Sequence, residues 1–300
     1  MGTTADMNVL ARKSTQLHAL TEEEKAQLKK ALLEMLQDLM RVFEKHHITY
    51  MLGFGSCLGA VRHGGFIPWD DDLDLLVLRK DLPKFFAIFE RELGDKYEFT
   101  APNTGKESKN NFTKIYKKGT LFLEISDTQT SFPKGIYIDI FPLDYAPENK
   151  FLRWIKGAFC NLLCQIAVSV FYAQYPSAEM TLFMSQSRKT KSAFFIRKMF
   201  GKGLSVIPHR TWCNWADKMM SGRKSHLMTI ACGRYFNNVL SKDIYLPGKK
   251  GLFEGVEVVL PQQPKIYLSS IYGKDYMQVP PPEKRERHFV IAFDAATERL

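Results

Sequence analysis

The sequence of 300 residues has little that would indicate a fold held together by disulfides or zinc. Its five cysteines are scattered and form no Cys-x-x-Cys pair, which argues against a disulfide framework and against a structural zinc site. The N-terminus is polar and lacks the apolar core of a signal peptide. Internal repeats and extended low-complexity tracts are also absent. We therefore expect a globular protein of a reducing cytosol.

What the sequence does contain is an ordinary globular composition, with 45% hydrophobic and 25% charged residues. A chain of this length buries about three quarters of its surface, so it can fold around its own core. This composition excludes wholesale disorder, a collagen-like fibre and a polytopic membrane protein. It is compatible with one large α/β domain or with two domains.

The net charge of +10 is concentrated in one region of the chain. Residues 151–250 carry 16 Lys or Arg against 3 Asp or Glu, whereas the other 200 residues sum to −3. Such asymmetry predicts a basic surface that faces the phosphates of a nucleic acid, an anionic membrane, or a charged glycan or lipid. A solvated basic insertion without such a partner is the alternative.

The pattern of apolar residues indicates helices and strands over residues 21–145. Thr21 and Glu24 form a capping-box pattern ahead of a helix that reaches about Lys45. This order suits an α/β sheet packed under helices. Residues 1–20 are predicted to be a flexible tail. The remaining segments predict helices at 58–61 and 82–93 and strands at 48–52, 73–78, 112–116, 121–125 and 136–141.

The second half of the chain is predicted to be mostly helical from residue 151 to about 224, with a hairpin over 252–260 and a short helix over 264–272. Residues 157–178 carry no formal charge, and that length is sufficient to cross a bilayer. Asn161, Gln165 and Ser169, however, recur at helical spacing and form one polar stripe. The stripe favours a buried or membrane-surface helix over a membrane span.

The most informative stretch has four Asp within residues 70–74, at the start of an apolar strand. Asp72 and Asp74 point to the same side of that strand, and neighbouring carboxylates repel each other unless a cation or proton lies among them. Such oxygen ligands suit Mg²⁺ or Mn²⁺. The Gly and Glu spacing of an EF-hand is absent. Asp70 and Asp71 fit a solvated acidic turn equally well.

A third carboxylate would complete a metal site or take a proton from a nucleophile. Asp139 is the best candidate, because an Asp between isoleucines on a strand is costly to bury without a partner. Asp144 is the rival, in what the sequence predicts to be a loop. Upstream of the acids, Gly55 and Ser56 predict a helix that begins at Ser56 and turns backbone amides toward an anion.

Residues 55–74, GSCLGAVRHGGFIPWDDDLD, resemble the LicD family, which includes bacterial phosphocholine transferases and has fukutin-type relatives. Residues 138–144 and the segment from Phe253 to His288 are similar to later parts of the family pattern. The resemblance implies an α/β (α+β) fold that is nucleotidyltransferase-like and related to the polymerase-β superfamily, with a mixed sheet, helices and a mostly helical basic insertion.

Cys57 stands where the family more often has Thr. We expect this change to affect contacts to the donor rather than metal binding.

The resemblance also implies roles for the acids: Asp72, Asp74 and Asp139 bind Mg²⁺ or Mn²⁺ and form the catalytic set. Asp139 is in addition a candidate to take the proton of an acceptor hydroxyl. The candidates for contact with the donor are Gly55, Ser56, Arg62, His63, Trp69, Lys118 and His288.

Each of the less specific candidates has an alternative interpretation. Arg62 and His63 either hold phosphate oxygens or only complement the dipole at a helix C-terminus. Trp69 either stacks on a base or a trimethylammonium group or packs before the acidic strand. Lys114 or Lys118 reaches a diphosphate unless it faces solvent. His288 either closes the site from the C-terminal segment or has no part in it.

The resemblance implies transfer of phosphocholine from CDP-choline to a hydroxyl of a cell-surface glycan or its lipid-linked precursor, with release of CMP, as in lipopolysaccharide biosynthesis. One alternative is another CDP-linked donor, such as an alditol phosphate. A second is a nucleotidyltransferase that acts on RNA or a nucleotide, although no nucleic-acid partner is expected. A third is a binding protein that has lost the chemistry.

Four regions are expected along the chain. Residues 1–20 are the tail, 21–150 the catalytic core, 151–250 a helical basic region that faces the acceptor or membrane, and 251–300 a C-terminal segment that returns to the core. The expected location is cytoplasmic, with peripheral contact to the inner face of the cytoplasmic membrane as a further hypothesis.

Overall fold

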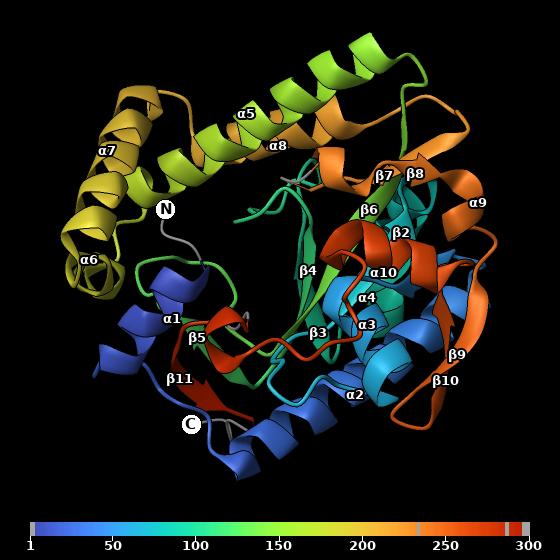
Figure 1. Ribbon diagram of the computed structural model, residues 1–300, viewed down its shortest axis with the longest axis horizontal. Coiled ribbons are helices and arrows are strands. Elements are labelled where there is room, and N and C mark those ends of the chain that lie inside the picture. The colour runs from blue at the N-terminus through green and yellow to red at the C-terminus, as the bar shows by residue number, and fades with distance from the viewer. Residues whose placement is uncertain (1–3, 233–234, 286–287, 296–300) are drawn as a thin grey trace.

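The computed structural model describes residues 4–232, 235–285 and 288–295 (Figure 1). Within these residues the centre is a mixed sheet in which β2 and β6 run parallel and the other neighbours are antiparallel. A mixed sheet with helices confirms the predicted α/β class. In sheet order the strands are β1 (Tyr50–Leu52), β2 (Asp74–Leu78), β6 (Tyr137–Ala146), β4 (Thr113–Lys117) and β3 (Tyr97–Thr100), with β7 (Leu227–Ile230) on the second half of β6 and β8 (Leu240–Ser241) beside β7.

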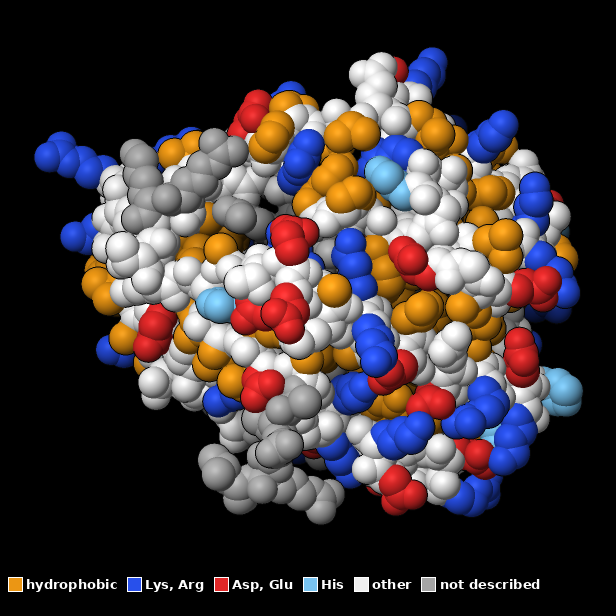
Figure 2. All heavy atoms as spheres, turned by 90° about the horizontal axis from the view of Figure 1, so that it is seen from below, with side chains coloured by type: hydrophobic (Ala, Val, Ile, Leu, Met, Phe, Trp, Pro, Cys, Tyr) orange, Lys and Arg blue, Asp and Glu red, His pale blue; other side chains and the backbone are white. Residues whose placement is uncertain are grey.

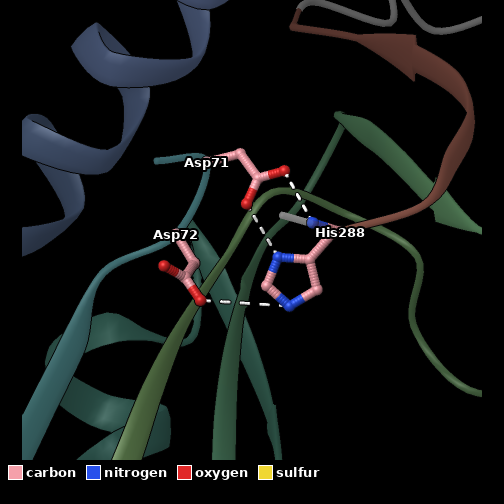
Figure 3. Close-up of side chains that lie close together, drawn as sticks. All are labelled: Asp71, Asp72 and His288. Atoms are coloured by element: carbon pink, nitrogen blue, oxygen red, sulfur yellow. Dashed lines mark hydrogen bonds and ion pairs between the residues drawn. The ribbon is translucent and has the colours of Figure 1, made fainter. Parts of the chain in front are cut away.

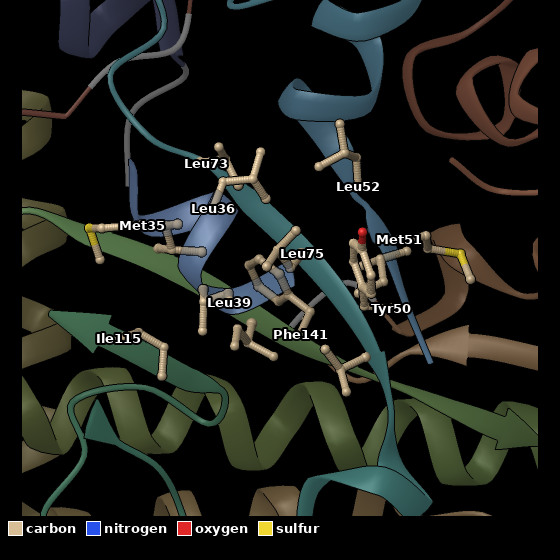
Figure 4. Packing of buried hydrophobic residues seen from close by; sticks show 14 of the residues in the cluster. Met35, Leu36, Leu39, Tyr50, Met51, Leu52, Leu73, Leu75, Ile115 and Phe141 are labelled. Atoms are coloured by element: carbon tan, nitrogen blue, oxygen red, sulfur yellow. The ribbon is translucent and has the colours of Figure 1, made fainter. Parts of the chain in front are cut away.

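The core lies between the sheet and α2 (Glu22–Lys45). The capping box is confirmed, since the Glu24 amide donates to the Thr21 hydroxyl and the Thr21 amide donates to the Glu24 carboxylate. Figure 4 shows side chains of this helix packed against those of β1, β2, β4 and β6. Both faces of β2 are buried, which explains its uninterrupted apolar sequence after Asp74.

Helix α3 (Phe54–His63) follows β1, and helix α4 (Leu82–Leu93) follows the 3-10 turn after β2. The hairpin β9 (Lys249–Phe253) and β10 (Val256–Leu260) packs beside β1 and α3, and α10 (Pro264–Tyr272) packs on α3. The predicted hairpin and the helix after it are therefore confirmed. The remaining short elements are α9 (Lys242–Tyr245) and the 3-10 turns Arg79–Asp81, Tyr235–Asn238 and Pro282–Lys284.

A layer of helices follows the sheet, and we call it the α5–α8 layer: α5 (Lys150–Gln174), α6 (Ala178–Ser185), α7 (Arg188–Leu204) and α8 (His209–Met220). Helix α5 packs against both α7 and α8 and runs along the upper edge of the view in Figure 1. The layer confirms the prediction of helices after residue 151 as far as Met220. Arg79, next to β2, pairs with Asp144 of β6 and with Asp217 of α8, and so ties the layer to the sheet.

Asp144 lies on β6 and not in a loop, so this prediction was wrong. Pro142 does not end the strand, because its carbonyl accepts the Ala231 amide at 2.8 Å while β7 pairs with the residues that follow. Asp144 is five residues beyond Asp139 and is neutralised by Arg79. It is therefore not a rival for the third acid beside Asp74.

The N-terminal segment was also predicted wrongly, because residues 4–13 form α1 (Thr4–Lys13) rather than a flexible tail. The Asn8 amide donates to the carbonyls of Glu283 and Arg285, and Leu10 is buried in a cluster with Phe183 of α6. Long-range contacts of this kind leave little local signal in a sequence. The C-terminal strand β11 (Val290–Asp294) likewise pairs with the distant β5 (Leu121–Glu124).

Candidate functional site

Three charged side chains lie in one row across the centre of the sheet. Asp74 of β2 is the register partner of Asp139 on β6, and Asp139 is also the register partner of Lys114 on β4. All three residues are buried. The Lys114 ammonium lies 2.9 Å from Asp139 Oδ1 and donates to Oδ2 at 3.2 Å. The sheet thus brings the predicted third acid directly beside Asp74, and we call these three residues the charged row.

The acids around this row raise one another's pKa values. Burial, reinforced by the charges of Asp72 and Asp139, raises the pKa of Asp74 well above its usual range. Burial also raises the pKa of Asp72 to about 6, with a further contribution from Asp71. The pKa of Asp139 is raised by burial, and Lys114 opposes that effect. One lysine therefore does not supply enough positive charge for this group of carboxylates.

His288 joins the acidic segment from the far end of the chain (Figure 3). Asp71 accepts the His288 backbone amide at 3.0 Å and lies 2.8 Å from its Nδ1. The other ring nitrogen, Nε2, is 3.9 Å from an oxygen of Asp72. Burial lowers the pKa of His288, but the nearby Asp71, Asp72 and Glu124 outweigh it and raise that pKa well above its usual range. The raised pKa favours the protonated ring, which lies between Asp71 and Asp72.

The grouping of possible metal ligands differs from the predicted set. In the described part of the chain, the ligand atoms that all lie within 4.8 Å of one another belong to Asp71, Asp72 and His288, not to Asp72, Asp74 and Asp139. The predicted set is linked instead by the register of β2 and β6 and by mutual electrostatic effects.

The carboxylates nevertheless fit a divalent cation on one specific observation. Asp139 Oδ1 is buried and receives no hydrogen bond, although the Lys114 ammonium lies close to it. Lys114 balances this one carboxylate, whereas burial and the neighbouring acids raise the pKa values of both Asp72 and Asp74, so a further positive charge is needed to hold all three groups as carboxylates. A set of carboxylate oxygens matches the preference of Mg²⁺ and Mn²⁺.

The start of α3 is tied to the acidic strand through the backbone. The Gly53 amide donates to the Asp74 carbonyl at 2.9 Å, and the Asp74 amide donates to the Ser56 hydroxyl at 2.8 Å. The helix begins at Phe54, two residues earlier than predicted, where the Phe54 amide donates to the Tyr267 hydroxyl. Ser56 therefore positions Asp74 directly.

Gly55 lies close to the Asp70 side chain at this same turn. A Cβ atom on Gly55 would lie 2.7 Å from an oxygen of the Asp70 carboxylate. A negative group thus stands at the helix start where the sequence predicted an anion, and it belongs to the protein itself. The Gly53 and Phe54 amides at this turn already donate to Asp74 and Tyr267.

Arg62, His63 and Trp69 form a second cluster, beside the C-terminal segment. The Arg62 guanidinium donates to the carbonyls of Tyr276 and Gln278 at 2.9 and 3.1 Å. The ring of Trp69 is covered by the Arg285 guanidinium at 4.1 Å, and its edge meets His63 at 6.2 Å between ring centroids. Arg62 and Trp69 therefore contact the C-terminal segment that leads to His288, whereas His63 packs on Trp69.

Lys118 is not brought to the carboxylates. Its side chain is exposed and donates to the Gly94 carbonyl at 2.5 Å, beyond the end of β4. Four residues of strand separate it from Lys114, a distance of roughly 13 Å. Lys114 takes the place beside the acids, because β4 is an interior strand between β6 and β3. Of the two alternatives for these lysines, exposure to solvent is therefore wrong for Lys114 and right for Lys118.

Sequence reasoning assigned no role to several groups that support the row. The Tyr137 hydroxyl donates to Glu124 at 2.9 Å, and the Lys114 ammonium lies 3.1 Å from the centre of the Tyr137 ring. Lys109 in turn donates to Glu124 and Asp127. No spacing in the sequence marks these contacts, since they join three separate strands and a loop. Asp71 did carry a signal, since it belongs to the acidic stretch, but the sequence left open whether it lies in a solvated turn.

Comparison with known proteins identifies the domain in which these acids lie. Residues 47–158 match the family described as LicD/FKTN/FKRP, nucleotidyltransferase domain. The lipopolysaccharide cholinephosphotransferase LicD of Haemophilus influenzae is 26% identical over 263 residues, which are 86% of this chain and 93% of that protein. The match confirms the resemblance found in the sequence.

Two further relatives match shorter stretches. An uncharacterized protein of Rickettsia prowazekii is 33% identical over 121 residues, which are 40% of this chain and 42% of that one. The ribitol 5-phosphate transferase FKRP of Homo sapiens is 43% identical over 53 residues, which are 18% of this chain and 11% of that one.

The matched family segment, residues 47–158, contains α3, β2, β4 and β6, and therefore the whole charged row.

Proposed function

We propose that this chain, whose residues 47–158 are a LicD/FKTN/FKRP nucleotidyltransferase domain, transfers phosphocholine from CDP-choline to a hydroxyl of a cell-surface glycan or its lipid-linked precursor, releasing CMP. The observation that carries the proposal is the register of Asp74 with Asp139 and Lys114 inside that domain. The cholinephosphotransferase among the relatives, which covers most of both chains, supports the choice of donor. The turn at Gly55 and Ser56 precedes the Asp-x-Asp motif of β2, and the third acid lies on β6, the neighbouring strand of the sheet. This order supports assignment to the polymerase-β superfamily.

In the proposed reaction the acceptor oxygen attacks the phosphorus that bears choline. A new phosphorus–oxygen bond forms in line as the bond to the bridging oxygen of the diphosphate breaks, and CMP leaves with that oxygen. The acceptor hydroxyl loses its proton to a base. We assign this proton to Asp139, whose carboxylate lies at the centre of the charged row, between Asp74 and Lys114.

Asp72, Asp74 and Asp139 would hold the divalent cation, which supplies positive charge to the diphosphate and to the leaving CMP. Lys114 holds the Asp139 carboxylate in place within the sheet. Ser56 fixes the backbone of Asp74, and His288 bridges Asp71 and Asp72. These contacts fix the position of each carboxylate before any substrate arrives, and positioning is the main contribution of the protein in phosphoryl transfer.

A second candidate is transfer of an alditol phosphate from a CDP-linked donor. It is favoured by the short match at 43% identity to a ribitol 5-phosphate transferase, which is a closer match per residue than the one to the cholinephosphotransferase. The two candidates share the acids and the leaving group. They differ in the group that the site must accept beside the distal phosphate.

The test is release of CMP from purified protein with Mg²⁺ or Mn²⁺, a crude glycolipid acceptor and, in parallel, CDP-choline or CDP-ribitol. We expect release from CDP-choline, together with choline incorporated into the glycolipid fraction. Release from CDP-ribitol alone would replace the donor and keep the mechanism. No release from either donor, in the presence of acceptor and metal, would contradict the proposed transfer.

A further inference from the structure

The outward face of α7 is apolar. Phe195, Ile196, Met199 and Phe200 are all exposed, with Ile196 at 66% and Phe195 at 62%. Their spacing places them on one face of the helix. The described residues of the molecule leave this face without cover. An apolar surface of this kind marks a site of contact with another phase or partner.

The same helix is strongly basic. It contains six Lys or Arg and no Asp or Glu. The helical repeat places Lys191, Lys198 and Lys202 along one flank of the apolar face. Helices with an apolar face bordered by lysines lie in the interface of a bilayer, where the lysine stems extend toward headgroup phosphates. The charge of α7 therefore indicates an anionic surface rather than an ordinary apolar partner.

The neighbouring helices extend the apolar exposure. Trp154 of α5 and Trp215 of α8 are exposed, as are Phe159 and Leu162 of α5. Exposed tryptophans are typical of the headgroup region of membranes. A groove of about 900 Å³ lies between α5 and α8, and Lys156 and Lys218 are among its lining residues. By contrast, Figure 2 shows another face of the molecule on which blue and red side chains are interspersed.

Among the residues that the structure describes, α5 is the one helix that meets the length and composition of a membrane span, with a mean hydropathy of 1.5 in its most apolar window. However, 44% of that window is buried inside the molecule, where Cys160, Cys164 and Val170 pack against neighbouring elements. These contacts with α7, α8 and the sheet favour a helix that lies on the membrane with its neighbours.

We propose that the outward surfaces of α5, α7 and α8 dock on an anionic phospholipid bilayer. The apolar side chains enter the headgroup region, and the flanking lysines contact lipid phosphates. The inference rests on the proposed function only for the reason that docking would be useful, since a lipid-linked acceptor lies at such a surface. It concerns a surface that contains none of the proposed catalytic residues.

The test is co-sedimentation of the full chain with vesicles of phosphatidylglycerol and phosphatidylcholine, compared with vesicles of phosphatidylcholine alone. We expect binding to the anionic vesicles that weakens as salt rises from about 50 to about 500 mM. The variant Ile196→Ser/Phe200→Ser and the variant Lys191→Gln/Lys198→Gln/Lys202→Gln should each bind at least about tenfold more weakly.

Matched controls change exposed residues of the same kinds outside the layer: Leu252→Ser/Ile266→Ser for the apolar pair and Lys249→Gln/Lys265→Gln for the lysines. Both controls should bind as the wild type does. Release of CMP from CDP-choline with a water-soluble acceptor should persist in the α7 variants, which separates loss of docking from loss of the transferase activity.

Several outcomes would overturn the proposal. These are no binding to anionic vesicles at low salt, equal binding to neutral vesicles, and the same loss in the controls as in the α7 variants. Loss of a dimer in the α7 variants without any lipid binding would assign the face to self-association. Resistance of the native protein to extraction from membranes by alkaline carbonate would assign α5 to a membrane span instead.

Discussion

The charged row and the α5–α8 layer are opposite in both burial and charge. The row places Asp74 and Asp139 at the centre of the sheet, where burial raises their pKa values. The layer places basic and apolar side chains at the surface. Among the described residues, the acids of the row lack sufficient positive charge nearby. The basic and apolar surface of the layer likewise lacks an anionic, partly apolar partner. In both regions, this incomplete compensation is what indicates a ligand.

Removal of an acid from the row should have the largest effect. Asp74→Ala should lower the rate of metal-dependent CMP release by at least about 10³-fold, because one of the carboxylates that hold the cation is lost. The matched control is Asp95→Ala, an exposed acid outside the row, which should keep wild-type activity. A loss of less than about tenfold in Asp74→Ala would show that the chemistry does not depend on the row.

The link between the two regions should be the next most sensitive point. Arg79→Ala leaves Asp144 and Asp217 buried without their common partner, so we expect the free energy of unfolding to fall by about 3–5 kcal/mol. Urea unfolding measures this change. The neighbouring exposed residue provides the control, since Lys80→Ala should change stability by no more than about 0.5 kcal/mol. Equal effects of the two substitutions would mean that the ion pairs do not join the layer to the sheet.

Lys114 and Lys118 sharpen the contrast between buried and exposed charge on one segment. Lys114→Met removes the partner of Asp139 and should destabilise the fold by about 2–3 kcal/mol. Lys118→Met removes only an exposed contact to a carbonyl, so its effect should stay within about 0.5 kcal/mol. Chemical denaturation of both variants in parallel measures these two changes in the free energy of unfolding. A larger effect at Lys118 would contradict the assignment of Lys114 to the row.

The support behind the row should produce a smaller, pH-dependent effect. Lys109 holds the pKa of Glu124 below its usual range, although burial opposes this. A lowered pKa in the folded state stabilises the fold above the unfolded pKa of about 4.3, and the benefit is lost as pH falls below it. Glu124→Gln should therefore cost about 1–2 kcal/mol at neutral pH and less at acid pH. A variant curve parallel to that of the wild type between pH 6 and 3 would contradict this role.

The sequence was sufficient for elements whose signal is local. The capping box of α2, the apolar run of β2 and the strand around Asp139 are each specified by neighbouring residues, and the structure places them as expected. The pairing of β2 with β6 then brings Asp139 beside Asp74. That neighbourhood was predicted from the cost of burying a lone Asp, which is a physical requirement visible in the sequence.

Contacts between distant segments could not be predicted in the same way. Helix α1 is held by the C-terminal segment, Asp144 by Arg79, and Asp71 by His288, which lies 217 residues away. The choice between Lys114 and Lys118 depended on which residue faces Asp139 across the sheet, and strand register is not encoded by either lysine. The role of each residue in the charged row depends on which strands pair and in which register, and these pairings are known only from the structure.

The central claim is that the charged row, with Asp72, holds a divalent cation. The direct measurement is Mn²⁺ binding to the purified protein by electron paramagnetic resonance, with and without CDP-choline. The account predicts saturable binding by the wild type, unchanged binding in Asp95→Asn and binding at least about tenfold weaker in Asp74→Asn. Mn²⁺ binding by Asp74→Asn as tight as that of the wild type, or no binding by the wild type even with CDP-choline, would contradict it.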